Sequence, residues 1–168
     1  MDLIMGMNSG SSFDGIDVIL AETEMAEDGF PRFICGGSYE WPKEVADIVQ
    51  DAFVNKVDMV GLNRLNYLCG AVFAEKAAQF LKENNIDSRD VKVLGLDTQT
   101  IYQEQPNHAA IAKMTKEEKD NWVGRWLSGN YPCGTQMGDT SVIANLVDID
   151  TVTHFRPADH TSGGAAAP

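Results

Sequence analysis

The sequence predicts an α/β domain in which helices flank a mixed β-sheet. Three strand-like segments come first, at residues 2–7, 15–24 and 30–39, and the second of them places apolar residues at alternate positions. Helical segments follow, and then the apolar run 91–96, which is typical of a strand in a sheet covered on both sides. Three strands followed by helix, strand, helix and strand indicate a mixed sheet.

A third strand and two helices are predicted between residues 30 and 84. The third strand is expected to turn Phe33, Cys35 and Tyr39 inward. Pro42 suits the start of a helix, because its fixed φ is compatible with the first turn and its missing N–H is not needed there. Apolar residues recur at three- and four-residue spacing through this helix and through a longer one at 58–84.

Later in the chain, a capped helix and two shorter elements are expected. The Thr-Lys-Glu-Glu segment at 115–118 is a capping box, which begins a helix. The apolar stripe of this helix includes Trp122 and Trp126, and their four-residue spacing favours packing between helices over a stacking platform for a ligand. A helical patch around 141–145 then precedes a last strand near 151–155.

Composition favours a soluble globular protein that binds neither nucleic acid nor membranes. Its 168 residues suit one domain or one large half of a two-domain enzyme. The 25 acidic and 13 basic side chains give a formal net charge of -12, which disfavours a nucleic-acid backbone or an anionic membrane as partner. Cys35, Cys69 and Cys133 form no close pair, which favours reduced thiols. No apolar run approaches the about 18 residues of a membrane span, so a cytoplasmic protein is expected.

Residues 6–17 contain the most informative polar loop. Six of the residues between Asn8 and Gly15 are Gly, Ser or Asn, which is more than a tight turn needs. Backbone N–H groups and serine hydroxyls at such a tip can bind a phosphate, because glycine lets the backbone approach the ligand closely. The alternative is an ordinary hairpin turn, and residue chemistry alone favours that alternative.

Three further polar clusters are candidates for ligand binding. Residues 97–100 follow the central strand, where open α/β sheets place ligands, although turn chemistry with a capping aspartate explains them equally well. Asp139 could hold a sugar hydroxyl or a metal-bound water, but a helix cap is the simpler interpretation. Arg156 and Asp159 are spaced either to orient a polar ligand or to form a surface ion pair. The histidines share no ligand spacing with the cysteines, which disfavours a zinc site.

The polar loop resembles the Gly-x-Met-Ser-Gly-Thr-Ser-x-Asp-Gly-x-Asp signature of the anhydro-N-acetylmuramic acid kinases. The matching positions are Gly6, Ser9, Gly10, Ser12, Asp14, Gly15 and Asp17, and Ser11 stands for the threonine. The other clusters follow in family order: Gln99 and Thr100 match the end of His-Gly-Gln-Thr, Gln136, Gly138 and Asp139 match Gln-x-Gly-Asp, and Phe155, Arg156 and Asp159 match Asp-Phe-Arg-x-x-Asp. The residues that look like the following Gly-Gly-x-Gly-Ala-Pro are Gly163, Gly164, Ala166 or Ala167, and Pro168.

This resemblance implies one lobe of an actin- and hexokinase-type ATPase with a ribonuclease-H-like core, in which the loop between the first two strands binds ATP phosphates. Family members use ATP and Mg²⁺ to open the 1,6-anhydro ring of a cell-wall sugar with water and to phosphorylate its O6. The expected phosphate-binding residues are Ser9, Gly10, Ser11, Ser12, Asp14 and Gly15. The expected sugar-binding residues are Asp97, Gln99, Thr100, Arg156 and Asp159.

Several positions depart from the family pattern. Asp97 and Thr98 stand where the family has His-Gly, and His154 stands where an aspartate precedes Phe-Arg. Asn8 replaces the methionine before the signature serine. The helical stretch 109–133 is expected to be an insertion between two motifs that the family spaces more closely. Together these departures indicate a divergent subgroup, and the expected substrate is anhydro-N-acetylmuramic acid or a related sugar.

The resemblance also implies a second lobe, which carries the family's general-base aspartate in an Asp-Thr-Gly-Pro-Gly-Asn motif. Nothing in these 168 residues matches that motif, so the chain is expected to be the N-terminal lobe alone, without turnover by itself. Three explanations stay open. The chain is half of a split or truncated kinase completed by a complementary chain or a homodimer, or a non-catalytic paralogue that binds a sugar or a partner, or a truncated product without function.

Overall fold

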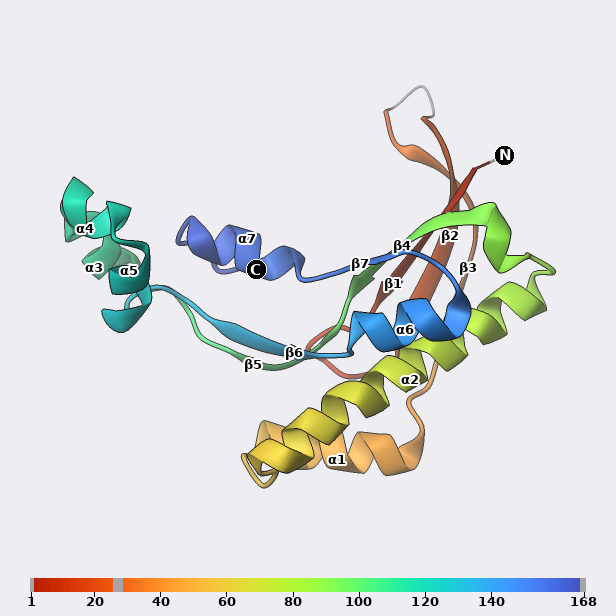
Figure 1. Cartoon of the computed structure of the whole chain (residues 1–168), viewed down its shortest axis with the longest axis horizontal. Helices are drawn as coiled ribbons and strands as arrows, with labels where there is room; N and C mark the ends of the chain where they lie inside the picture. Colours follow the sequence, from red (N-terminus) through yellow and green to blue (C-terminus); the bar gives the residue numbers. More distant parts are fainter. Residues whose placement is uncertain (1, 26–28, 167–168) are drawn as a thin grey trace. The chain divides into compact units, whose positions relative to one another are not determined.

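The computed structural model describes residues 2–25 and 29–166, and the chain divides into two compact units (Figure 1). The first unit consists of Met1–Ile101 and Gln136–Thr153 and contains the central sheet. The second unit consists of Tyr102–Thr135 and His154–Pro168 and is mainly helical. Among the described residues, no helix combines the length and the apolar character that a membrane span requires.

The first unit is built on a five-stranded mixed sheet with the strand order β3-β2-β1-β4-β7. β1 pairs antiparallel with β2, and β2 pairs antiparallel with β3, whereas the β1–β4 and β4–β7 pairs are parallel. The mixed sheet predicted from the order of elements is thus confirmed. The strands are β1 (Leu3–Asn8), β2 (Ile16–Met25), β3 (Pro31–Tyr39), β4 (Val91–Asp97) and β7 (Thr151–Val152).

One face of this sheet forms the core together with three helices, α1 (Lys43–Phe53), α2 (Met59–Glu83) and α6 (Thr140–Val147). Alternate residues of the strands, such as Met5, Val18 and Leu94, are buried in a single apolar cluster with residues of these helices. The opposite face is only partly covered by the described residues, because Ile19 is 50% exposed on it. The sheet therefore does not have the complete two-sided cover that the sequence predicts.

The third strand departs from its predicted alternation. Cys35 and Tyr39 are half-buried against the core, as predicted, but Phe33 is 64% exposed. The cause is a register shift: Leu20 pairs with Cys35, whereas the next residue, Ala21, pairs with Phe33. Because the bulge adds one residue to β3, the alternation reverses and Phe33 lies on the face opposite Cys35.

The helices of the first unit begin where the sequence places them. Pro42 is the N-cap of α1, and Asp58 is the N-cap of α2, where its side chain accepts a hydrogen bond of 2.7 Å from Gly61 N–H. Figure 1 shows α2 running beside α6, and the absence of a side chain at Gly70 permits their contact. A Cβ at Gly70 would lie 2.8 Å from the carbonyl oxygen of Asp139, so α2 packs directly on the start of α6.

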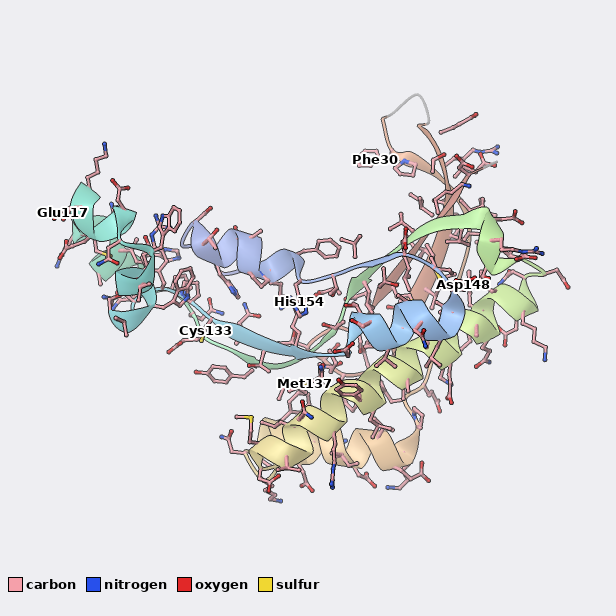
Figure 2. All side chains as sticks on the ribbon, viewed as in Figure 1. Phe30, Glu117, Cys133, Met137, Asp148 and His154 are labelled. Atoms are coloured by element: carbon pink, nitrogen blue, oxygen red, sulfur yellow. The ribbon has the colours of Figure 1, made fainter. Side chains whose placement is uncertain are left out.

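The later part of the chain differs more from its prediction. Two strands that were not predicted from the sequence, β5 (Gln99–Gln103) and β6 (Gly134–Met137), form a two-stranded sheet. The predicted strand near 151–155 is shorter, because His154 has a positive φ of 61° and ends the extended backbone. Phe155 then begins a helix, α7 (Phe155–Thr161). Figure 2 shows His154 where the chain enters this helix.

The capped helix is divided into two. The capping box of Thr115 and Glu118 is present, but α4 (Lys116–Asp120) ends at once, and Asn121 caps a second helix, α5 (Trp122–Leu127). The helix before them is α3 (His108–Lys113), and a 3-10 turn, η1 (Ser88–Asp90), precedes β4.

The expected packing of both tryptophans between helices is wrong. Trp122 is 75% exposed. Trp126 lies 5.8 Å from the ring of Tyr131 and donates a hydrogen bond to the carbonyl of Pro132, which belongs to a loop. Because α4 and α5 are only 5 and 6 residues long, they form no continuous stripe for another helix to cover.

Candidate functional site

The loop between β1 and β2 is held at its base by Ser9, whose side chain is completely buried. Its backbone N–H donates to the carbonyl of Asp97, 3.2 Å away. Its Oγ lies 2.7 Å from Gln99 Oε1 and 3.0 Å from the carbonyl oxygen of Gly15, and it accepts a hydrogen bond from the indole N–H of Trp41 at 3.1 Å. The base of the predicted phosphate loop is thereby joined to β5, which carries predicted sugar-binding residues.

The far side of the loop is anchored by Phe13. This residue has a positive φ of 54°, which is uncommon for a side chain larger than glycine. Its ring packs on Trp41 at 5.2 Å and on Phe53 at 5.9 Å between centroids, and Trp41 in turn contacts Phe73 in the core. The aromatic contacts hold the strained backbone in place, and they favour an ordered loop over a loose turn.

The tip between these anchors presents unused donors. The turn is closed by a hydrogen bond from Phe13 N–H to the carbonyl of Gly10. The backbone N–H groups of Gly10, Ser11 and Ser12 donate to no protein group among the described residues. The two serines and Asp14 are exposed, whereas Gly10 and Gly15 are half-buried. Successive free N–H groups beside two hydroxyls fit an anionic phosphate group.

The predicted sugar-binding residues that follow β4 lie beside the loop base, in the same unit. Gln99 and Thr98 are completely buried, and Thr100 is nearly so. The hydroxyls of Thr98 and Thr100 have no hydrogen-bond partner in the described structure. Asp97 is half-buried and accepts a hydrogen bond of 2.6 Å from Gln136 Nε2, which also donates to the carbonyl of Thr98. The first and second predicted clusters are therefore in direct contact.

The Gln-x-Gly-Asp segment is positioned by α2 through Asn66. The Asn66 side-chain oxygen accepts a hydrogen bond from Gly138 N–H, and its carbonyl accepts one from Asp139 N–H. Asp139 caps α6 by accepting from the N–H groups of Ser141 and Val142, at 2.9 and 3.2 Å. The simpler interpretation of Asp139, a helix cap, is confirmed.

Arg156 and Asp159 lie in the second unit, on α7. Arg156 contacts β5, and Asp159 contacts the segment that follows α7. Arg156 Nη1 donates to Gln103 Oε1 at 2.8 Å, and the Gln103 amide nitrogen donates to the carbonyl of Ala165. The Asp159 carboxylate accepts a hydrogen bond of 2.7 Å from Ala166 N–H. Asp159 directly, and Arg156 through Gln103, thus contact the segment that follows the helix.

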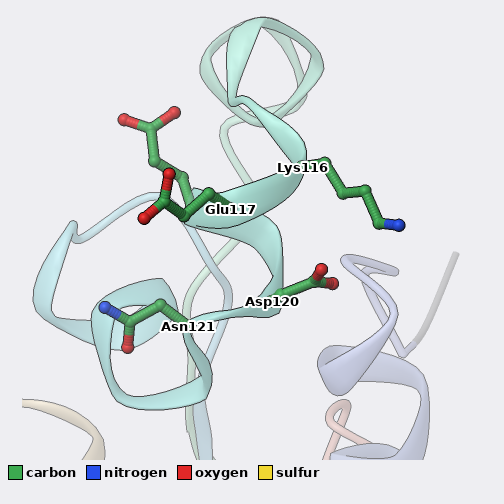
Figure 3. A pocket seen from close by; sticks show the side chains of 5 residues that line it. Lys116, Glu117, Asp120 and Asn121 are labelled. Atoms are coloured by element: carbon green, nitrogen blue, oxygen red, sulfur yellow. The ribbon is translucent and has the colours of Figure 1, made fainter.

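Neither of two surface pockets contains a predicted site residue. One, in the second unit, is lined by α4 and its neighbour Asn121 (Figure 3). The other is lined by residues near η1 and the end of α6, in the first unit. In the part of the chain that the structure describes, no group of three or more His, Cys, Asp or Glu side chains is placed to hold a metal ion.

Sequence reasoning missed the residues that orient the loop and the helix. Trp41, Asn66 and Gln103 lie outside the polar clusters but form hydrogen bonds with residues of those clusters. Phe13 lies within the loop, and its apolar ring, which packs on Trp41, is not one of the polar groups for which the loop was singled out. The only available signal was the aromatic character of Trp41 directly before the helix-starting Pro42, because an apolar residue at that place often packs on the neighbouring turn.

The fold and the loop together define the class of protein. A sheet of order β3-β2-β1-β4-β7, with three antiparallel strands first and a Gly- and Ser-rich loop between the first two, is that of an actin- and hexokinase-like ATPase lobe. The chain belongs to the anhydro-N-acetylmuramic acid kinase family, whose model matches residues 2–168. The resemblance stated from the motifs is thus confirmed.

Individual relatives are distant and longer than this chain. An anhydro-N-acetylmuramic acid kinase of Vibrio vulnificus is 27% identical over 168 residues, which cover 99% of this chain and 39% of the relative. Enzymes with the same name from Aliivibrio fischeri and Legionella pneumophila are each 28% identical, over 170 and 169 residues. The chain spans 39% of the length of each of these curated relatives.

Proposed function

We propose that this chain supplies the phosphate-binding lobe of an ATP- and Mg²⁺-dependent sugar kinase. The reaction would open the 1,6-anhydro ring of anhydro-N-acetylmuramic acid, or of a related sugar, with water and phosphorylate O6. The observation that carries the proposal is the loop tip, where the N–H groups of Gly10, Ser11 and Ser12 have no partner among residues 2–25 and 29–166. Membership of the kinase family supports the same assignment.

The loop residues would divide the work of phosphate binding. The free N–H groups and the hydroxyls of Ser11 and Ser12 would donate to phosphate oxygens, and Gly10 and Gly15 would let the backbone come close. A carboxylate repels a phosphate, so Asp14 would act through Mg²⁺ or one of its waters. The hydroxyl and the N–H of Ser9 already bind Gln99, Gly15 and Asp97, so a contact between Ser9 and a phosphate would have to displace one of them. The role of Ser9 would therefore be to hold the loop base.

Sugar-binding residues are proposed in each unit separately, after β4 in the first unit and on α7 in the second. The unpartnered hydroxyl of Thr100 and the buried amide of Gln99 suit sugar hydroxyls, because such ligands both donate and accept hydrogen bonds. Arg156 and Asp159 on α7 would form hydrogen bonds with the sugar. Asp97 would line the sugar site at the position where the family has histidine. A related sugar is proposed because this replacement exchanges an imidazole for a carboxylate.

The proposal is tested by complementation. The chain would be mixed with a second protein carrying the Asp-Thr-Gly-Pro-Gly-Asn motif, and ATP-dependent phosphorylation of anhydro-N-acetylmuramic acid and other anhydrosugars would be measured. We expect activity only in the mixture, since the motif that provides the family's general base is not in these residues. A formed complex without activity on any anhydrosugar would contradict the kinase proposal. It would favour a non-catalytic module that binds a sugar or a partner.

A further inference from the structure

Trp41 connects the core to the β1–β2 loop in two different ways. It lies between β3 and α1 and is half-buried. Its ring packs on Phe13 at 5.2 Å and on Phe73 at 5.3 Å, and its indole N–H donates to Ser9 Oγ at 3.1 Å. We propose that Trp41 is a positioning residue that fixes the Ser9 hydroxyl and thereby couples the loop to Gln99 on β5. The consequence for ATP rests on the proposed function, whereas the coupling itself does not.

The hydrogen-bond capacity of Ser9 explains the coupling. A serine hydroxyl has one proton to donate and two lone pairs to accept with. The indole N–H occupies a lone pair, and the proton then has two acceptors in reach, Gln99 Oε1 at 2.7 Å and Gly15 O at 3.0 Å. Ser9 is completely buried, so water cannot replace a lost partner without a structural change. The loss of the indole donor therefore leaves a buried lone pair of Ser9 Oγ without a partner, which weakens the hydrogen-bond network that holds the hydroxyl against these acceptors.

The three partners of Ser9 come from three different places in the chain. Trp41 precedes α1, Gly15 begins the return of the loop into β2, and Gln99 begins β5. One buried hydroxyl thus links the predicted phosphate-binding loop with the strand that carries predicted sugar-binding residues. A change at Trp41 reaches both sides through Ser9, although Trp41 belongs to none of the polar motifs.

The substitution Trp41→Phe separates the two roles of the indole. Phenylalanine retains an aromatic ring that can contact Phe13 and Phe73, but it has no N–H to donate to Ser9. The matched control is Trp126→Phe in the second unit, because Trp126 Nε1 also donates one hydrogen bond to a protein oxygen, the carbonyl of Pro132 at 3.0 Å. The two variants make the same chemical change at places with different neighbours.

The decisive measurement is amide hydrogen exchange by NMR in the full chain without ligand. The Ser9 N–H donates to the Asp97 carbonyl at the end of β4, and the Phe13 N–H donates to the Gly10 carbonyl within the loop. The exchange of these two amides therefore reports how well the loop is held. In Trp41→Phe we expect both amides to exchange about three- to tenfold faster, the range of one lost hydrogen bond. Amides of the strand interior, such as Val18, should be unchanged. The Trp126→Phe control should leave the loop at wild-type rates.

Two further experiments, the variant Ser9→Ala and an ATP titration, also test the inference. If Trp41→Phe does not fold, Ser9→Ala removes the same bond from its other end, and the Trp41 indole N–H resonance should shift and exchange faster. ATP titration of the complemented protein should show about three- to tenfold weaker binding in Trp41→Phe. Wild-type exchange at Ser9 and Phe13 in the folded variant would overturn the inference. Absence of ATP binding by the wild type would instead overturn the proposed function alone.

Discussion

A side chain at Gly10 is expected to block a ligand at the loop tip without destabilising the loop. A Cβ added at Gly10 would lie 3.4 Å from the hydroxyl of Ser12 and 4.0 Å from its backbone nitrogen, both ordinary contacts, and no positive φ restricts the position. The protein itself therefore has room for a side chain there. A phosphate that approaches the N–H groups of residues 10–12 does not have that room, because the side chain occupies the same side of the loop tip.

The substitution Gly10→Val is therefore predicted to abolish nucleotide binding while leaving the fold intact. We expect a change in the free energy of unfolding of no more than about 0.5 kcal/mol, as for other surface substitutions. Binding of ATP should weaken at least tenfold, about 1.4 kcal/mol, as measured by calorimetry with the complemented protein. Asp14→Ala should also weaken binding, with Mg²⁺ present. Unchanged ATP affinity in both variants would support the alternative that the loop is an ordinary hairpin turn.

At the same scale, residue types predicted the loop but not what holds it. The Gly, Ser and Asp residues of 8–15 are recognisable because their chemistry is local to the segment. The partners of Ser9 are not, because Trp41 and Gln99 are 32 and 90 residues away in the sequence. The interpretation of Asp139 as a cap succeeded for the opposite reason, since its partners are the next two or three residues.

At the scale of elements, periodicity predicted long segments and failed at irregular ones. The helix α2 was predicted within one residue at each end, because 25 residues of apolar spacing and an aspartate cap agree. The exposure of Phe33 depends on a bulge opposite Ala21, which alternation alone does not reveal. The break between α4 and α5 depends on the capping side chain of Asn121, which competes with continuation of the helix.

The contact between β3 and α2 gives a prediction about pH. The Tyr39 hydroxyl donates to Glu83 Oε2 at 2.7 Å. Burial, and then the bond to Glu83, raises the pKa of Tyr39 from 10.0 to about 12, and the same hydrogen bond lowers the pKa of Glu83. Because the folded state favours the protonated phenol, its contribution to stability is complete below about pH 10 and is lost as the pH rises through about 12.

Tyr39→Phe should therefore remove part of the alkaline sensitivity of the fold. Thermal unfolding would be followed from pH 8 to the highest pH at which the wild type is folded. We expect the variant to be less stable near neutral pH and the difference to shrink above about pH 10. Tyr67→Phe is the matched control, because Tyr67 lies on α2, is exposed and has no hydrogen bond from its hydroxyl in the described structure. A difference that stays constant with pH would contradict the assignment.

At the scale of the whole molecule, the chain combines a core unit with a helical unit built from two separate segments. The ends of the segment 105–132 are close together, since Glu104 N–H donates to the carbonyl of Cys133 at 2.8 Å. Within the second unit, Arg125 donates to the carbonyl of Thr161 at 2.9 Å and so ties this segment to the end of α7. The segment 105–132 thus contacts the end of α7 and stabilises it within the second unit.

Excision of residues 105–132, with a short glycine-containing turn in their place, is predicted to leave the first unit folded. The turn can join the adjacent ends without moving β5 or β6, and the hydrogen bonds that the structure describes for Ser9 all involve residues outside the segment 105–132. We expect unchanged exchange at the Ser9 amide and unchanged ATP affinity, but faster exchange at the Ala166 amide, because α7 has lost Arg125. Arg125→Ala in the full-length chain is the control, and it should reproduce the change at Ala166 alone. Loss of ATP binding on excision would show instead that the segment 105–132 belongs to the nucleotide site.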